Sequence, residues 1–255
     1  MDMSSDVWGV PNRPGIGWGD LYIPMHKHQF NSEMEFFKVS WIRNYSGVNA
    51  CNKILANKAI TANQSVVAQV RAYRALYYYN LFNLYRNIPL DTTFVHEKGW
   101  LPEQAEPQVT FNWIERELKA VADQCPSKVE MGKINKYAVH MLLAKLYLNH
   151  NAWFKDDTDK SWYGKCIDEI NEVVKGPFSL AASYSANFME DISSSPEIIS
   201  EYLSRTNMPG AIIWPIFGHI MRAAPVGDFP VGPQAAASCS RNSWKHTRKM
   251  TLATM

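Results

Sequence analysis

The chain has 255 residues, with 26 basic and 24 acidic side chains and a formal net charge of +2. A charge balance this close to neutral argues against a protein drawn to nucleic acid or anionic lipid by long-range electrostatics. The sequence has no run near the roughly 18 apolar residues of a membrane span, and its first residues lack the basic and apolar regions of a secretory signal. We therefore expect either a cytosolic protein or a chain that starts downstream of its signal.

The N-terminal segment, residues 1–30, has the composition of a loop. Its stretch "VPNRPGIGWGD" places two Pro and three Gly around Arg13 and Trp18, which predicts an ordered surface loop. Helical spacing begins near Asn31 and continues to about Leu55. The apolar side chains that this spacing places on one helix face are Phe37, Trp41, Tyr45 and Val48.

The stretch "VVAQVRAYRALYYYNLFNLYRNIPL", residues 66–90, predicts a helix that starts near Ser65 and is ended by Pro89. At 100° per residue its apolar side chains fall on two arcs. A surface helix has one apolar stripe, so we expect this helix to lie between neighbours, with its aromatic side chains filling space on both sides. The first arc holds Val66, Val70, Tyr73, Tyr77, Leu81 and Leu84, and the second holds Ala68, Ala72, Ala75, Tyr79 and Phe82.

A polar strip between these arcs carries Arg71 and Arg74. Two interpretations remain open for the strip: the arginines bind an anionic ligand, or they pair with buried carboxylates as structural groups. Further along, Glu115 and Glu117 do not share a helix face. We expect both carboxylates to be exposed.

Three more helices are indicated after Pro89. Thr110 is the predicted N-cap of the first, which runs to Pro126. Residues 134–150 are apolar nearly all round, and residues 163–175 have one apolar face. The side chains expected to point inward from that face are Tyr163, Cys166, Ile167, Ile170, Val173 and Val174.

An apolar helix followed by an amphipathic one resembles a tetratricopeptide hairpin, although no clean 34-residue repeat is present. The predicted fold class is therefore mostly α, with helical hairpins and long loops. After about Ser193 a strand or a short helix is indicated. From Ala223 onward the sequence has neither helical nor strand periodicity.

Enzyme motifs are missing from the sequence: it contains no GxSxG, P-loop, GxGxxG or HExxH pattern. The four cysteines are scattered and predict neither a zinc site nor a disulfide framework. His26 and His28 share a side only in an extended segment and have no third ligand nearby, so we expect solvated or ligand-facing histidines rather than a metal site. The prediction is a protein without catalytic residues, metal or cofactor.

Four segments, taken in order, resemble the SusD/RagB family of outer-membrane nutrient-binding proteins. The Arg-Ala-x-x-Tyr helix that closes on Ile-Pro-Leu is similar to the family's signature helix. The other segments are "SSDVWGVPNRPGIGWGD", "WIRNYSGVNACNKIL", and the helix pair of residues 137–175 followed by "SPEIISEY", which is similar to a strand of the family. The resemblance covers roughly residues 4–203.

The resemblance implies a lipoprotein on the external face of the outer membrane. Such a protein binds oligosaccharides, or sometimes peptides, without being an enzyme, and delivers them to a SusC-like TonB-dependent transporter. Its membrane contact would be a lipid anchor outside this chain, and nucleic acid is not an expected partner. A cytosolic tetratricopeptide-type scaffold that binds peptides in a helical groove is the alternative.

The ligand-binding residues that the resemblance implies are Arg13, Trp18, His26, His28 and Phe30. Tryptophan faces stack on the C–H surfaces of sugars, while arginine and histidine hydrogen-bond hydroxyls. Phe30 stands where the family has tryptophan, which leaves the class of ligand open. The alternative for Trp18 is an aromatic side chain that anchors its own loop.

The C-terminal segment departs from the family. Residues 1–233 are expected to form a partial SusD-like domain, without the family's lipoprotein signal and C-terminal part. Residues 234–255 match nothing in the family, and we interpret them as a disordered tail produced by a frameshift after about Gly232. A domain cut in this way should expose surface that the full-length protein buries, so we expect marginal stability or aggregation.

Overall fold

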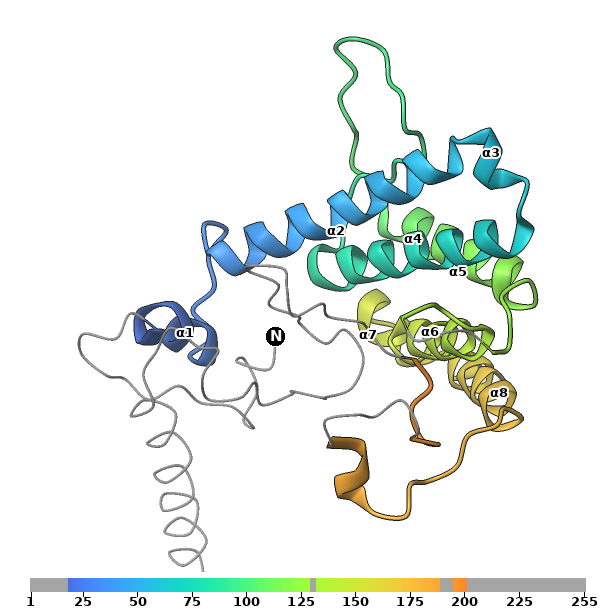
Figure 1. Cartoon of the computed structure of the whole chain (residues 1–255). Coiled ribbons are helices and arrows are strands. Elements are labelled where there is room, and N and C mark those ends of the chain that lie inside the picture. The colour runs from blue at the N-terminus through green and yellow to red at the C-terminus, as the bar shows by residue number, and fades with distance from the viewer. Residues whose placement is uncertain (1–17, 129–131, 189–194, 201–255) are drawn as a thin grey trace, which may run out of the picture. The chain divides into compact units, whose positions relative to one another are not determined.

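The computed structural model describes residues 18–128, 132–188 and 195–200, which are drawn in colour in Figure 1. The described residues are mostly helical, and no strand forms among them, so the predicted fold class is confirmed. One isolated antiparallel bridge joins Pro89 to Gln104. The helices are α1 (Trp18–His26), α2 (Glu35–Leu55), α3 (Lys58–Thr61), α4 (Gln64–Tyr85), α5 (Pro107–Ala122), α6 (Lys136–Leu148), α7 (His150–Phe154), α8 (Ser161–Val174) and the 3-10 helix η2 (Tyr184–Phe188).

The chain divides into two compact units. The described part of the first unit is residues 18–38, and that of the second begins at Val39 and ends at residue 200. None of the helices in the described ranges is both long and apolar enough to cross a bilayer.

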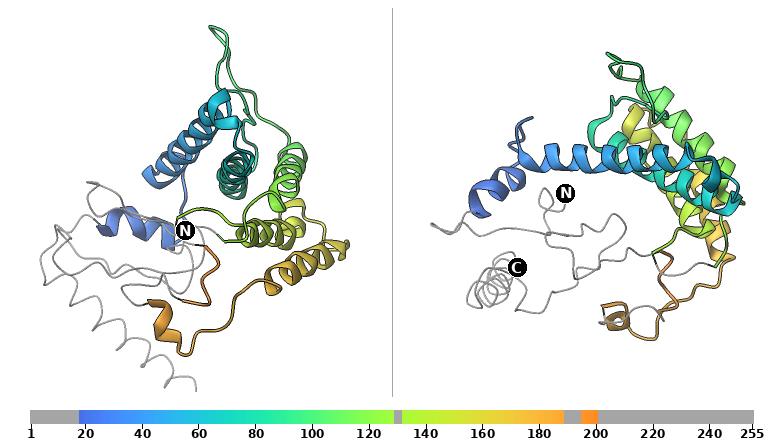
Figure 2. Two further views of the ribbon diagram at one scale, coloured as in Figure 1. Left: turned by 45° about the vertical axis from the view of Figure 1, so that its right-hand side comes forward. Right: turned by 45° about the horizontal axis from the view of Figure 1, so that its top comes forward.

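Helix α4 lies at the centre of the second unit, as its two apolar arcs predicted. Figures 1 and 2 show it between α2 and α5. Asn63 caps its start, since the Asn63 side chain accepts a hydrogen bond from the Val66 N–H at 3.2 Å. Its end comes earlier than expected. Arg86 has a φ of 66°, a left-handed conformation that stops the helix three residues before Pro89.

Helix α2 packs against α4 through aromatic side chains and one glycine. The rings of Trp41 and Tyr85 meet edge to face, with their centroids 5.0 Å apart. A Cβ atom on Gly47 would lie 2.5 Å from Cζ of Tyr77, a distance that no side chain can occupy without displacing its neighbour. The absence of a side chain at Gly47 therefore allows this close approach.

A ring cluster fills the space around α5, α7 and the start of α8. Phe111 at its centre is fully buried and meets its neighbours edge to face, with centroid distances from 5.0 to 6.5 Å. Such pairs contribute about 0.5–1.5 kcal/mol each beyond the burial of their area. The rings in contact with Phe111 are Phe82, His150, Trp153, Phe154 and Trp162.

Helix α5 begins earlier than its predicted cap. It starts at Pro107, with Glu106 in the capping position and proline in the first turn. Thr110 lies inside the helix and is buried. Proline at the first helical position costs no hydrogen bond, and for this reason the helix can extend upstream of the threonine.

The prediction of which α8 side chains point inward was largely wrong. Only Cys166 and Val173 are buried, against α6. The other predicted inward residues remain exposed because, among the described residues, α8 packs chiefly on α6 and its far side is uncovered. Those exposed side chains are Tyr163, Ile167, Ile170 and Val174.

Residues 195–200 form turns and bends in place of the strand that the resemblance implied. Asn135 Nδ2 donates to the carbonyl oxygen of Ile199 at 2.7 Å, and the N–H of Ser179 donates to that of Pro196 at 3.1 Å. Glu197 also accepts hydrogen bonds from the Ala181 N–H at 3.1 Å and from Asn187 Nδ2 at 2.6 Å, so the segment is held mainly to residues that follow α8. The predicted loss of period from Ala223 onward, like residues 201–233 and the tail at 234–255, lies outside the described residues.

Candidate functional site

The predicted ligand-binding residues fall at the N-terminal end of the described chain. Arg13 lies outside the described residues. Trp18 is the first residue of α1, so the loop predicted for residues 1–30 gives way to a helix at this point. The helix contains Pro24, whose missing N–H removes one possible hydrogen bond to the preceding turn. His26 ends the helix and is exposed.

The turn after α1 brings two of the predicted residues together. His28 has a φ of 55°, and the N–H of Gln29 donates to the Pro24 carbonyl at 2.8 Å, so the chain reverses tightly here. The rings of His28 and Phe30 lie stacked, with centroids 5.8 Å apart. Phe30 also meets Phe37 edge to face at 6.0 Å and is 50% exposed.

A second ring pair supports this turn. Tyr22 of α1 stacks on Phe36 of α2, with centroids 4.9 Å apart. The sequence did not predict that aromatic rings from α1 and α2 would meet here. These rings belong to Tyr22, Phe36 and Phe37, of which only Phe37 had been placed on the apolar face of its helix. Their contacts depend on the turn that joins the two helices, and periodicity alone does not specify that turn.

The arrangement has the chemistry of a small stacking surface. An exposed phenyl ring beside an imidazole offers one apolar face and nitrogen atoms that can donate or accept hydrogen bonds. Sugars and other flat ligands with hydroxyl groups match this combination. Among the described residues, no three His, Cys, Asp or Glu side chains come close enough together to hold a metal ion.

The alternatives left open for Arg71 and Arg74 are resolved in favour of structural ion pairs. Arg71 donates from Nε and Nη2 to the two carboxylate oxygens of Glu117, at 3.0 and 2.8 Å. Arg74 Nη2 donates to Glu117 Oε2 at 3.2 Å. The expectation that Glu117 is exposed is wrong: it is 8% exposed and lies opposite α4.

The protonation of Glu117 follows from these partners. Burial raises the pKa of its carboxyl, but the hydrogen bonds from Arg71 and the charges of both arginines outweigh burial and hold the pKa below its ordinary value. The Glu117 hydrogen bonds likewise raise the pKa of Arg71. The three side chains are therefore a charged network of the core and not a vacant anion site.

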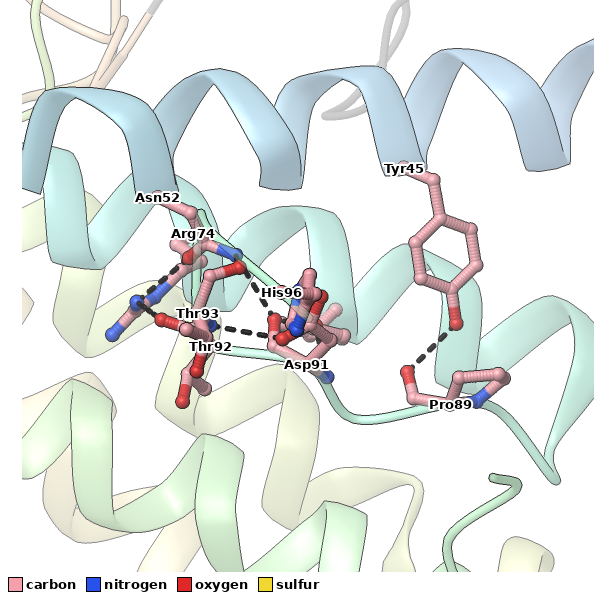
Figure 3. A network of polar contacts seen from close by, with 9 residues as sticks. Tyr45, Asn52, Arg74, Pro89, Asp91, Thr92, Thr93 and His96 are labelled. Carbon is pink, nitrogen blue, oxygen red and sulfur yellow. Dashed lines mark hydrogen bonds and ion pairs between the residues drawn. The ribbon is translucent and has the colours of Figure 1, made fainter. Parts of the chain in front are cut away.

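Arg74 also links this network to the chain that follows α4, as Figure 3 shows. Its Nη1 atom donates to Asn52 Oδ1 at 2.9 Å and to the Thr92 carbonyl at 3.4 Å. Asn52 Nδ2 in turn donates to the carbonyl oxygens of Asp91 and Thr93, at 3.1 and 3.3 Å. Tyr45 of α2 donates to the carbonyl of Pro89 at 2.7 Å, so the whole segment is fixed to α2 and α4.

No family model matches the sequence, and no curated protein matches it. Solved structures do match. A SusD-like protein from Bacteroides fragilis has a TM-score of 0.59 at 17% identity, over 70% of this chain and 36% of its own. A structure with xylogluco-oligosaccharide has a TM-score of 0.59 at 19% identity, over 68% of this chain and 36% of its own.

A laminarin-binding SusD-like protein has a TM-score of 0.51 at 22% identity, over 64% of this chain and 35% of its own. The chain therefore spans about a third of the length of these structures. Likenesses at these identities concern the fold. Together with the helical architecture of the described residues, they confirm the expected resemblance at that level: the chain has the mostly helical SusD-like fold.

Proposed function

We propose that the full-length protein is a surface binding protein that captures oligosaccharides and passes them to a SusC-like TonB-dependent transporter. The observation that carries this proposal is the fold, which the chain shares with one protein that binds laminarin and with another solved with xylogluco-oligosaccharide. Binding without chemistry is consistent with a sequence that has no catalytic motif. The external face of the outer membrane is the corresponding location.

The residues proposed to contact the sugar are Arg13, Trp18, His26, His28 and Phe30. The stacked pair of His28 and Phe30 supports this assignment, because an exposed ring beside a hydrogen-bonding ring suits a sugar face. An aromatic contact contributes about 0.5–1.5 kcal/mol. Loss of the Phe30 ring should therefore weaken binding roughly 2- to 12-fold.

Isothermal titration of the 255-residue chain with laminarin and with xyloglucan oligosaccharides tests the proposal. Phe30→Ala and Trp18→Ala should weaken binding of whichever glycan the unmodified chain binds. Gln29→Ala is the matched control. Gln29 lies between His28 and Phe30 in the sequence, its side chain is exposed, and its hydrogen bond to Pro24 comes from the backbone. Equal affinities for Phe30→Ala, Trp18→Ala and Gln29→Ala would remove these aromatic residues from the site.

Delivery to a transporter is tested separately on the encoding DNA and in membranes. An upstream reading frame with a lipoprotein signal ending in Cys would support the surface location. Co-purification of the full-length protein with a TonB-dependent barrel would support the partner. A stop codon and ribosome site directly before Met1 would contradict both and favour the cytosolic scaffold.

A further inference from the structure

The long loop between α4 and α5, residues 91–106, extends away from the helices of the second unit, as the green segment of Figure 1 shows. It is closed where it leaves the helices. Pro89 and Gln104 form the isolated bridge, and the N–H of Ala105 donates to the Ile88 carbonyl at 2.9 Å. A loop closed in this way carries its outer residues on a fixed stem.

The stem is anchored in the core through Tyr78. This tyrosine is fully buried, and its hydroxyl donates to the carbonyl oxygen of Asp91 while it accepts the Asp91 N–H at 2.8 Å. Asn52 donates to the same carbonyl at 3.1 Å. Burial raises the pKa of Tyr78, so the hydroxyl keeps its proton and remains a donor at any physiological pH.

The Asp91 side chain links the anchored stem to residues further out in the loop. Its Oδ1 atom accepts the Thr93 N–H at 2.9 Å, and its Oδ2 atom lies 2.9 Å from Nε2 of His96. The imidazole of His96 is stacked on the indole of Trp100, with the ring centroids 3.6 Å apart and the planes only 6° from parallel. Trp100 is thereby connected to the buried Tyr78 through Asp91 and His96 (Figure 3 labels Asp91 and His96).

The backbone at the tip holds the same arrangement. The N–H of Trp100 donates to the Glu97 carbonyl at 3.1 Å, which closes a four-residue turn. Gly99, the third residue of that turn, has a φ of 91°, a conformation that glycine adopts without strain and that a type II turn requires. The turn brings Trp100 back over His96, four residues earlier in the sequence.

Trp100 remains 45% exposed although His96 covers one face of its ring. A flat apolar ring therefore stays accessible, and the Asp91–His96 pair, each with a side chain 25% exposed, fixes its orientation from the covered face. An exposed indole held in a fixed orientation is the kind of surface on which the C–H face of a sugar ring stacks.

We propose that Trp100, supported by His96 and Asp91, is a carbohydrate-stacking platform separate in sequence from residues 26–30. The inference rests on the proposed function, since it assigns a second contact to a glycan-binding protein. The second unit would then carry an aromatic contact of its own for a glycan.

The test uses the whole 255-residue chain labelled with 5-fluorotryptophan and titrated with laminarin and with xyloglucan oligosaccharides. The fluorine resonance of Trp100 is identified as the one missing in Trp100→Phe. It should shift on titration, and Trp100→Ala should weaken binding roughly 2- to 12-fold. Trp100→Phe, which keeps an aromatic ring, should retain part of the affinity.

Leu101→Ala is the matched control, because Leu101 is the next residue of the same loop and its apolar side chain is 80% exposed. Its affinity for the glycan should equal that of the unmodified chain. An equal loss in Leu101→Ala and Trp100→Ala, or binding of the loop to phosphatidylcholine vesicles, would overturn the inference and indicate a general apolar contact surface instead.

Two further outcomes separate this inference from the proposed function. If Trp100→Ala binds glycan like the unmodified chain while Phe30→Ala binds weakly, the platform at Trp100 is refuted and the proposed function stands. If the unmodified chain binds none of the glycans and the Trp100 resonance does not move, both are refuted.

Discussion

Replacing Glu117 should destabilise the second unit more than any surface carboxylate does. Arg71 and Arg74 donate three hydrogen bonds to Glu117, two to Oε2 and one to Oε1. Glu117→Gln keeps a single acceptor oxygen and so retains at most two of them, while both arginines keep their charge. Removing one partner from a buried ion pair costs about 3–5 kcal/mol.

In a unit of this size, 1 kcal/mol corresponds to about 2–4 °C in Tm. Glu117→Ala, which loses all three hydrogen bonds, should therefore lower the Tm by roughly 6–20 °C, with Glu117→Gln between it and the unmodified chain. Thermal unfolding followed by circular dichroism at 222 nm measures both variants. Helix content at low temperature should be unchanged, because Glu117 is needed for packing and not for helix formation.

The matched control is Glu115→Gln, two residues earlier in α5. Glu115 accepts hydrogen bonds from Lys119 and from the hydroxyl of Tyr147. The lysine is half-exposed and Gln can still accept from the tyrosine, so the expected cost is under about 1 kcal/mol. A loss of Tm in Glu117→Gln no larger than in Glu115→Gln would refute the view that the network in the core is a major source of stability.

The pH dependence of stability, compared between the unmodified chain and Glu117→Gln, gives a second check. The pKa of Glu117 is lowered in the folded chain, so its contribution is complete above the ordinary carboxyl value of 4.5 and is lost as the pH falls through the depressed folded value. The stability difference between the unmodified chain and Glu117→Gln should thus be constant near neutral pH and narrow below 4.5. A difference that widens under acid conditions would contradict the assigned charge state.

Three other changes test the packing. Gly47→Ala should lower the free energy of unfolding by about 1–3 kcal/mol through its clash with Tyr77. Its control is Gly164→Ala, whose new Cβ meets no atom within 4 Å and which should be neutral or stabilising by up to about 1 kcal/mol. Equal melting temperatures for the two variants would argue against the close approach of α2 to α4. Tyr78→Phe should raise amide exchange at the start of the α4–α5 loop by removing its anchor, and unaltered exchange would show that the other hydrogen bonds suffice. Ile167→Lys places a charge on the exposed apolar side of α8, where Ile167 is 58% exposed. It should reduce the expected aggregation of the chain, measured by sedimentation, without lowering the Tm. Unchanged aggregation would show that this side of α8 does not drive it.

The central helix was predictable because its information is local. Its two apolar arcs follow from spacing alone, and residues such as Tyr79 and Phe82 are buried as expected. The ion-pair interpretation of Arg71 was also available from the sequence, but its partner was not. Glu117 lies 46 residues away, and only the packing of α5 on α4 brings the two together.

The helix boundaries and the extent of burial were less predictable. Periodicity marks the apolar side of α8 but does not tell how much of that side has a neighbour, and Ile170 is therefore exposed where burial was expected. The Pro and Gly residues of "VPNRPGIGWGD" led to a loop prediction for all of residues 1–30, although Trp18–His26 forms α1. The stacked pair of His96 and Trp100 gave no sequence signal, because the loop that holds it has no period and depends on one turn at Gly99.

Within the candidate site, the rings of His28 and Phe30 are stacked and His26 is exposed. Ligand binding by all five residues, Arg13, Trp18, His26, His28 and Phe30, stays a prediction. The sequence shows that His28 and Phe30 are two residues apart. It does not show the left-handed backbone at His28, which turns the chain after α1.

The rings around Phe111 have an optical consequence. Trp153 and Trp162 both lie against Phe111 in defined edge-to-face geometry. Fixed asymmetric surroundings give aromatic side chains their near-ultraviolet circular dichroism, and this signal disappears when packing loosens while helices persist. The near-ultraviolet spectrum should therefore report whether α5, α7 and α8 are packed together, independently of how much helix the chain contains.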